Sequence, residues 1–242
     1  MVSSVALFKF ALTALLLAWP GARNTPPATD MAIMAYCYSG ALSTNGFVQE
    51  RRSCRIAREL SEVVEEHADA GRIPFQGPKA KEATVLALLE IARHESDFRE
   101  KVEDCRITGD PPSKHAKIDE GLAISMYQLR SNSWYDLFKK AGVFPGTSHP
   151  RPRSYLREEV CRSNPLAARL ALHALMRLPL SRKKNPSTYP AGIAPMFFTY
   201  SGNRGRPSKA GREHIKAFEM MMRQNKLVMV PTNGPMWVEA AP

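Results

Sequence analysis

The feature that most constrains the fold of this chain is an apolar stretch with a helical period, from Glu82 to His94. At 100° per residue, one stripe of such a helix holds Val85, Leu88, Leu89 and Ala92. Glu95 falls at the edge of this stripe and Ser96 falls within it. The sequence therefore predicts a helix with one buried face that ends in a half-buried glutamate.

Further helices are marked by start and stop signals. Their first residues are expected near Ser53, Ser133, Asn164 and Ser208. The helix from Ser53 is expected to stop at Gly71 to Pro74, and the helix from Asn164 before Pro179. Strand patterns are nearly absent. We therefore expect a mainly α protein with short irregular or β pieces.

The N-terminus is typical of a secretory signal peptide. Lys9 precedes an uncharged run, Phe10 to Trp19, which is followed by Pro20, Gly21 and Ala22. The run is too short for a comfortable membrane span. We therefore predict a signal peptide over residues 1–22 and an exported protein, periplasmic or extracellular. An uncleaved N-terminal anchor is the alternative.

Four cysteines, Cys37, Cys54, Cys105 and Cys161, agree with export. Three pairings are open. We expect neighbours to pair, because this staples the N-terminal segment locally. A zinc site is the rival interpretation, but the chain has no Cys-x-x-Cys pair. His94 and Glu95 begin like a zinc-protease motif, yet Phe98 stands where the second histidine is needed. No metal or cofactor is expected.

The chain is basic, with a formal net charge of +11 over 242 residues. Such a balance favours acidic partners. Nucleic acid is disfavoured, because the chain carries an export signal and no recognisable nucleic-acid motif. Peptidoglycan and the anionic polymers around it fit the charge equally well, although any single lysine or arginine is more simply part of a solvated surface.

Glu95 is the candidate catalytic residue. Desolvation disfavours the charged form of a carboxyl group, so a half-buried glutamate can hold a proton and act as a general acid. The alternative is a glutamate at a helix end that faces water. Two later segments favour catalysis: Ser125 to Leu129 places a glutamine inside an apolar stretch, and Phe197 to Gly202 is an aromatic run that ends in Tyr-Ser-Gly.

In this order the three segments resemble the lytic transglycosylase and lysozyme-like superfamily. Its pattern has Glu-Ser, then Gly-Leu-Met-Gln or a variant, then Ala-Tyr-Asn with a glycine close behind. Ser125 stands where glycine is usual, and Thr199 and Ser201 replace the common neighbours of Tyr200. The resemblance implies a lysozyme-like α domain over residues 77–226, after a helical N-terminal extension over 23–76 with one helix. Residues 227–242 lack a periodic pattern and are expected to form an arm.

The resemblance also assigns roles to individual residues. Glu95 becomes the general acid and base, and Ser96 supports the helix end by bonding the backbone one turn earlier. The expected substrate-binding residues are Gln128, Tyr200, Tyr127 and Ser125, with the Tyr200 hydroxyl orienting Glu95. The implied substrate is the glycan strand of peptidoglycan.

A hydrolase needs a second carboxylate or a positioned water, whereas a lytic transglycosylase uses the sugar's own hydroxyl. The candidates for a second carboxylate are Asp97, Glu103, Asp104, Asp119 and Glu120. None has a distinctive setting in the sequence, where each is more simply a solvated loop carboxylate, and this favours a lytic transglycosylase that cuts the MurNAc-GlcNAc β-1,4 bond. The alternatives are a lysozyme-like muramidase, a catalytically silent cell-wall binding protein and a basic nucleic-acid or envelope-assembly protein.

Overall fold

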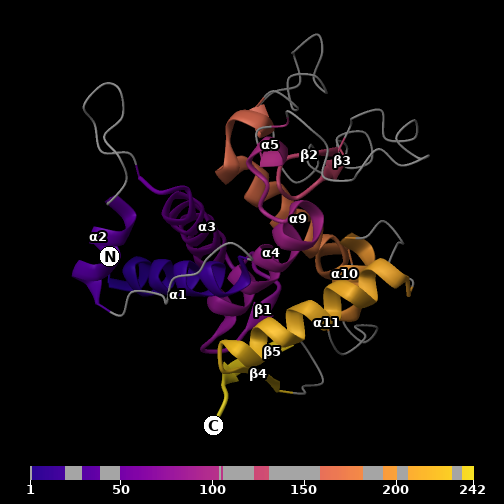
Figure 1. Ribbon diagram of the computed structural model, residues 1–242. Helices are drawn as coiled ribbons and strands as arrows, with labels where there is room; N and C mark the ends of the chain where they lie inside the picture. Colours follow the sequence, from indigo (N-terminus) through magenta and orange to yellow (C-terminus); the bar gives the residue numbers. More distant parts are fainter. Residues whose placement is uncertain are drawn as a thin grey trace.

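Helices make up most of the molecule, as the sequence predicts (Figure 1). The computed structural model describes residues 2–19, 29–38, 50–103, 105, 123–130, 159–181, 193–200, 207–230 and 236–242. Its longer helices are α1 (Val2–Ala18), α3 (Arg52–Asp69), α4 (Ala80–Ser96), α9 (Asn164–Ser181) and α11 (Lys209–Gln224). The shorter ones are α2 (Asp30–Tyr38), α5 (Glu100–Glu103) and α10 (Ala194–Tyr200).

Helix α4 is the centre of the fold. It packs against α1, α3, α9 and α11 (Figure 1). Every residue from Ala83 to Ala92 is buried. The predicted single apolar stripe is therefore wrong for this helix. A helix that is apolar on all sides can be covered on all sides, and here Glu90 is the one ionisable residue inside the buried run.

The segment predicted as a signal peptide forms α1, which packs against α3 and α4. Its side chains in the core include Leu7, Ala11, Leu12 and Leu15. Beyond its end, the Trp19 ring stacks on Phe98 at a centroid distance of 5.3 Å. Thus this segment contributes to the core of the full chain, while cleavage and export stay predictions. Within the described ranges, no helix has the length and apolar character needed to cross a membrane.

The C-terminal tail is a β-hairpin rather than the predicted arm. Strands β4 (Leu227–Val230) and β5 (Met236–Ala240) pair antiparallel, and β5 also pairs in parallel with β1 (Phe75–Gln76). Gly77 permits this close pairing, because a Cβ there would lie 2.6 Å from the Val238 carbonyl oxygen. Sequence periodicity missed strands this short, since their pattern is set by partners far away in the chain.

Both disulfides join the predicted neighbours. Cys37 of α2 pairs with Cys54 of α3, and Cys105, just after α5, pairs with Cys161. The first bridge ties together two helices of the N-terminal extension, where the sequence predicted only one helix.

Most predicted helix ends agree with the structure. Ser208 caps α11, because its Oγ accepts a hydrogen bond from the Gly211 amide at 3.0 Å. Helix α9 extends to Ser181, so the predicted stop before Pro179 is wrong. A proline removes one N–H donor and crowds the carbonyl four residues earlier, which disfavours a helix interior, but α9 continues two residues past Pro179. The helix predicted from Ser133 to Ala141 lies outside the described residues.

Candidate functional site

Glu95 lies in the last turn of α4, which ends where Asp97 adopts a left-handed conformation with φ 50°. Ser96 fixes this end, because its Oγ donates to the Ala92 carbonyl at 2.6 Å and accepts from the Phe98 amide at 3.2 Å. The expected bond from Ser96 to the backbone one turn earlier is therefore present. The Glu95 side chain is 24% exposed. Its carboxylate is thus half-buried, as predicted, and retains a path to solvent.

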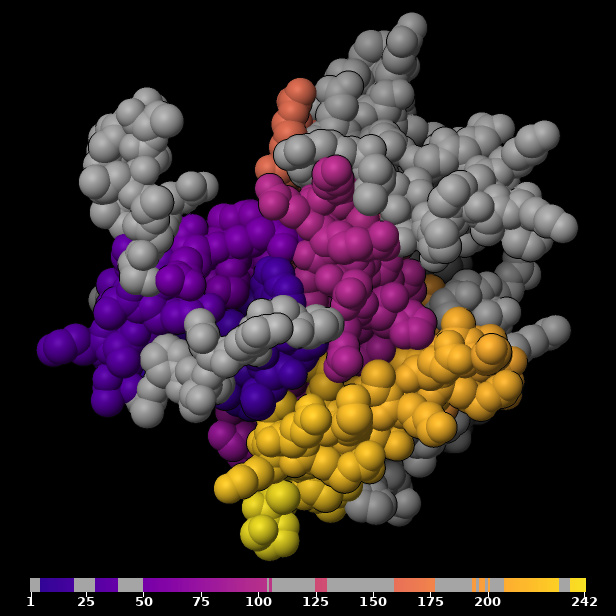
Figure 2. Space-filling view, in the orientation of Figure 1, coloured from indigo at the N-terminus to yellow at the C-terminus, as the bar shows by residue number. Residues whose placement is uncertain are grey.

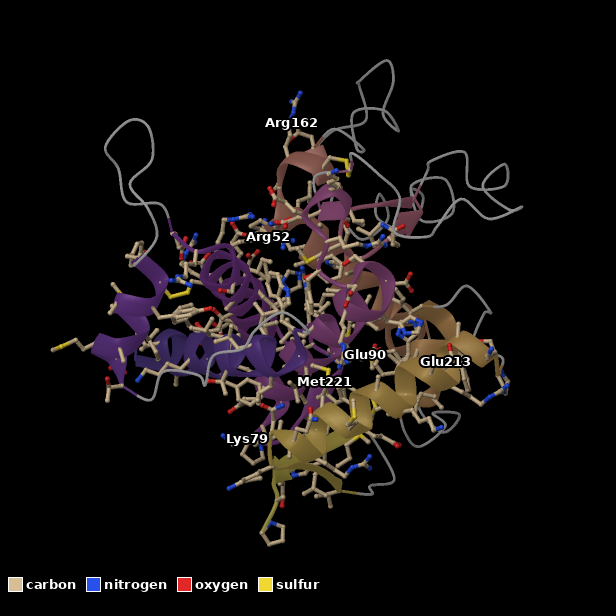
Figure 3. All side chains as sticks on the ribbon, in the orientation of Figure 1. Arg52, Lys79, Glu90, Arg162, Glu213 and Met221 are labelled. Atoms are coloured by element: carbon tan, nitrogen blue, oxygen red, sulfur yellow. A yellow bond between two sulfur atoms is a disulfide. The ribbon has the colours of Figure 1, made fainter. Side chains whose placement is uncertain are left out.

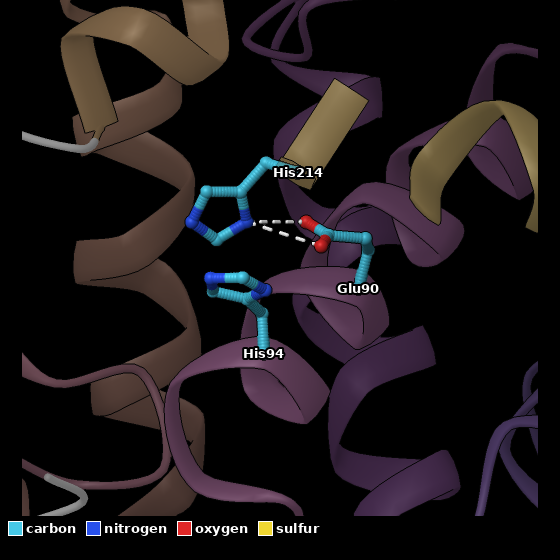
Figure 4. A group of neighbouring side chains, drawn as sticks. All are labelled: Glu90, His94 and His214. Carbon is cyan, nitrogen blue, oxygen red and sulfur yellow. Dashed lines mark hydrogen bonds and ion pairs between the residues drawn. The ribbon is translucent and has the colours of Figure 1, made fainter. Parts of the chain in front are cut away.

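His214, on α11, lies between two carboxylates of α4. Its Nε2 is 3.3 Å from Oε1 of Glu95, and its Nδ1 is 2.8 and 3.0 Å from the two oxygens of Glu90 (Figure 4). His214 and Glu90 are almost completely buried. The contact to Glu90 is a normal charged hydrogen bond, whereas the contact to Glu95 is longer and lacks standard hydrogen-bond geometry. We therefore treat the second contact as a charge interaction.

This arrangement governs the charge of the imidazole. Burial alone would lower the pKa of His214, but hydrogen bonding and charge interactions with Glu90 and Glu95 outweigh it and raise the pKa to about 9. Burial raises the pKa of Glu90, and its bond to His214 opposes that effect. Near neutral pH the cluster consequently presents an imidazolium beside Glu95.

Helix α10 holds α11 in the position that delivers His214. The imidazole stacks on the Phe197 ring at 5.6 Å and meets the edge of Tyr200 at 6.2 Å. The two helices approach closely at Gly211, where a Cβ would lie only 2.3 Å from the Phe198 ring. Figure 2 shows α11 lying across the molecule against the segment that contains α4 and α5. The fold thus brings the α11 histidine against the end of α4.

The second predicted segment forms a hairpin that reaches the third. Strands β2 (Ala123–Ile124) and β3 (Leu129–Arg130) pair around the turn that contains Tyr127. The buried Tyr200 hydroxyl donates to the Tyr127 carbonyl at 2.6 Å. Burial, followed by the negative charge of Glu95, raises the pKa of Tyr200 well above its usual value. Tyr200 thus lies within electrostatic reach of Glu95, although its hydroxyl proton goes to Tyr127 rather than to that carboxylate.

All four predicted substrate-binding residues are buried. In the hairpin, the Gln128 side-chain amide donates to the Ser125 carbonyl at 2.9 Å, and the Tyr127 amide donates to Ser125 Oγ at 3.3 Å. Ser125 and Gln128 both have positive φ, 65° and 47°. These bonds stabilise a tight turn, so the described contacts of Ser125, Tyr127, Gln128 and Tyr200 support the site. Contact with sugar stays a prediction.

Of the five candidate second carboxylates, Glu103 and Asp97 lie within the described residues. Glu103 is buried and accepts from Arg52 at 2.5 Å, from Arg55 at 2.8 Å and from Asn164. It is therefore not the solvated loop carboxylate that the sequence suggested. Asp97 is exposed. The remaining three, Asp104, Asp119 and Glu120, lie outside the described residues.

Sequence reasoning missed the partners of Glu95. Glu90 was detectable as a charged residue inside the apolar stretch, and His214 precedes Phe218 by one turn on the apolar face of α11. His94 lies one turn after Glu90, and its ring is 4.1 Å from that of His214 (Figure 4). Neither signal reveals the pairing, because α4 and α11 are joined only by tertiary packing.

Comparison with known proteins gives no match: no family model, no curated protein and no solved structure is similar to this chain. The features that bear on function are therefore those of the site: the half-buried Glu95, the imidazolium beside it, and the contacts that link Tyr127, Tyr200 and His214.

Proposed function

We propose that this protein is an exported peptidoglycan-cleaving glycosidase, a lytic transglycosylase that cuts the MurNAc-GlcNAc β-1,4 bond with Glu95 as general acid and base. One observation carries the proposal. Contacts link the three segments named by the resemblance in series: Tyr200 bonds Tyr127, and His214 contacts both Tyr200 and the half-buried Glu95. These segments are far apart in the sequence, and neither the charge nor the helical periodicity of the chain requires them to meet.

The proposed chemistry begins when Glu95 gives its proton to the leaving glycosidic oxygen. The imidazolium of His214, 3.3 Å from Oε1, stabilises the carboxylate that this transfer creates. Glu95 then accepts the proton of the muramic acid 6-hydroxyl as that oxygen closes on the anomeric carbon. The product is a 1,6-anhydro sugar, and Glu95 regains its proton for the next cycle.

The setting of Glu103 favours this route over hydrolysis. A hydrolase needs a carboxylate that can act as nucleophile or hold a water opposite the acid. Glu103 is buried among two arginines and an asparagine, and Glu90 is buried against His214. Both of these carboxylates are engaged inside the protein, so neither is available as the nucleophile or as the holder of a water, which favours intramolecular closure by the sugar hydroxyl.

The test is to digest purified peptidoglycan and analyse the products by mass spectrometry. A lytic transglycosylase yields 1,6-anhydromuropeptides, lighter by one water than hydrolysed products. Glu95→Gln should lower the rate by about 10²–10⁴-fold, because the amide keeps the size of the side chain but donates no acidic proton. Glu100→Gln is the matched control, since Glu100 is an exposed glutamate on the neighbouring α5. It should cleave like the parent.

Each other outcome has a defined meaning. Reducing-end muropeptides as the main product would identify a muramidase. Peptidoglycan binding without release of muropeptides would indicate the catalytically silent cell-wall protein. Equal rates for Glu95→Gln and the parent would remove Glu95 from the mechanism.

A further inference from the structure

Three side chains beside the proposed acid have the composition of a metal site. Glu90 and His94 lie one turn apart on α4, so they share a face of that helix. His214 faces them from α11 (Figure 4). One ligand atom from each residue lies within 4.8 Å of the others. We propose that Glu90, His94 and His214 bind a divalent transition-metal ion of the zinc type.

The donor set selects the class of ion. Two imidazoles and one carboxylate suit Zn²⁺ and similar ions, and Zn²⁺ sites with three protein ligands keep a fourth position for water or substrate. Mg²⁺ and Ca²⁺ prefer oxygen ligands, and this cluster has only one carboxylate to offer. The site therefore discriminates against the common hard cations.

In the metal-free protein Nδ1 of His214 bonds Glu90, and an ion would take the place of the proton in that bond. Nδ1 faces Glu90 at 2.8 Å, on the side where the ion would lie, and the buried Nε2 faces Glu95 at 3.3 Å. Histidines that bind metals usually donate their other ring N–H to a carboxylate or a carbonyl, which fixes the ring. Glu95 is the carboxylate beside Nε2 here, at 3.3 Å and in charge contact. Glu95 is thus a partner of the ligand His214 and not a ligand itself.

The burial of Glu90 and His214 and the exposure of His94 are compatible with a bound ion that solvent can reach. Glu90 and His214 are almost fully buried and come from two packed helices, so two ligands are held in place before an ion arrives. His94 is exposed, so it lies on the solvent side of the proposed site. Ligand atoms about 2.0–2.2 Å from a shared tetrahedral ion lie about 3.4 Å from one another. Side-chain adjustment would therefore have to close the widest separation, which is at most 4.8 Å, and open the 2.8 Å between Nδ1 of His214 and Glu90.

The proposal goes beyond the glycosidase assignment and can be tested without it. Isothermal titration calorimetry of the oxidised full chain with Zn²⁺, and the visible spectrum of the Co²⁺ form, report binding directly. We expect one ion per chain, a four-coordinate Co²⁺ spectrum, and no comparable binding of Mg²⁺ or Ca²⁺. Paramagnetic shifts of the His94 and His214 imidazole signals in the Co²⁺ form should identify the ligands even if a variant does not fold.

Variants give the decisive comparison. His94→Ala should weaken Zn²⁺ binding by at least about 100-fold, because losing a mere partner of a ligand already costs about 10–100-fold. His173→Gln is the matched control, since His173 is a buried histidine that contacts His67 on other helices. Equal Zn²⁺ affinity of His94→Ala and the parent would overturn the proposal, as would loss of binding in His173→Gln alone. A metal-binding chain that leaves peptidoglycan intact would refute only the glycosidase assignment.

Discussion

Two buried carboxylates, Glu90 on α4 and Glu103 on the next helix, α5, have different surroundings. Glu103 is bound by Arg52, Arg55 and Asn164, where α5 meets α3 and α9. Glu90 is bound by His214, between α4 and α11. In Figure 3 the labelled Arg52 and Glu90 lie in these two separate regions. We refer to them as the Glu103 cluster and the Glu90 cluster.

The difference lies in whether the positive partner can lose its proton. Arginine stays charged at every pH that a protein encounters, so the Glu103 cluster is a fixed ion-pair network. Arg52 of this cluster also donates a hydrogen bond from Nη1 to the Phe98 carbonyl at 2.7 Å, which holds the turn that follows Glu95. Histidine changes charge near neutral pH and binds metals. A structural role therefore suits the Glu103 cluster, and a chemical role suits the Glu90 cluster.

The largest expected effect on stability comes from the disulfide beside the Glu103 cluster. Replacing Cys105 and Cys161 by serine opens a separation of 56 residues, which should reduce the free energy of unfolding by roughly 4 kcal/mol. Urea unfolding under oxidising conditions measures this loss. If the two clusters are independent, the His214 imidazole signals should stay unchanged in the folded fraction. A loss below about 1 kcal/mol would mean that the bridge contributes little to the fold.

Removing the Glu103 carboxylate should be the next largest effect. Glu103→Leu leaves two arginines without their partner, and we expect a loss of about 3 kcal/mol. Glu100→Gln, an exposed change on the same helix, should stay within about 0.5 kcal/mol of the parent. Thermal and denaturant unfolding compare the two variants. Lower cleavage per folded molecule in Glu103→Leu would contradict a purely structural cluster.

Raising the pH should distinguish the two clusters in the metal-free protein. The folded pKa of His214, about 9, lies above its usual value of 6.5. The imidazolium therefore stabilises the fold fully below pH 6.5, and this stability is lost as the pH rises through 9, by an amount on the order of 3 kcal/mol. Denaturant unfolding with a chelator present measures the slope. Glu90→Gln should flatten it, and an unchanged slope in that variant would assign the titration to another group.

The smallest effect should come from the start of α11. Ser208→Ala removes the side-chain acceptor of the Gly211 amide, which should cost about 1 kcal/mol. Because α11 carries His214 but no residue of the Glu103 cluster, only the Glu90 cluster should respond. The side-chain amide signal of Asn164 is a suitable reporter of the other cluster, and a change there would show that the clusters are coupled.

The sequence predicted part of the candidate site correctly. Helical period located α3, α4 and α11, and the capping signal located Ser208 at the start of α11. The half-burial of Glu95 and the role of Ser96 also followed from local pattern. The tail was wrong, because β4 and β5 are short and depend on pairing with β1. The burial of the four expected substrate-binding residues was also not foreseen, since burial depends on which helices cover a turn.

What the sequence alone determined about this protein is local: the helical segments and the place of Glu95 at the end of a buried helix. Such features follow from periodicity and capping within a few turns of chain. Tertiary structure alone decided that His214 lies between Glu90 and Glu95 and that Glu103 lies among arginines. Those contacts join residues 48 and 124 positions apart. Only the packing of α3, α4, α5 and α11 selects them from the many charge pairs that the chain could form.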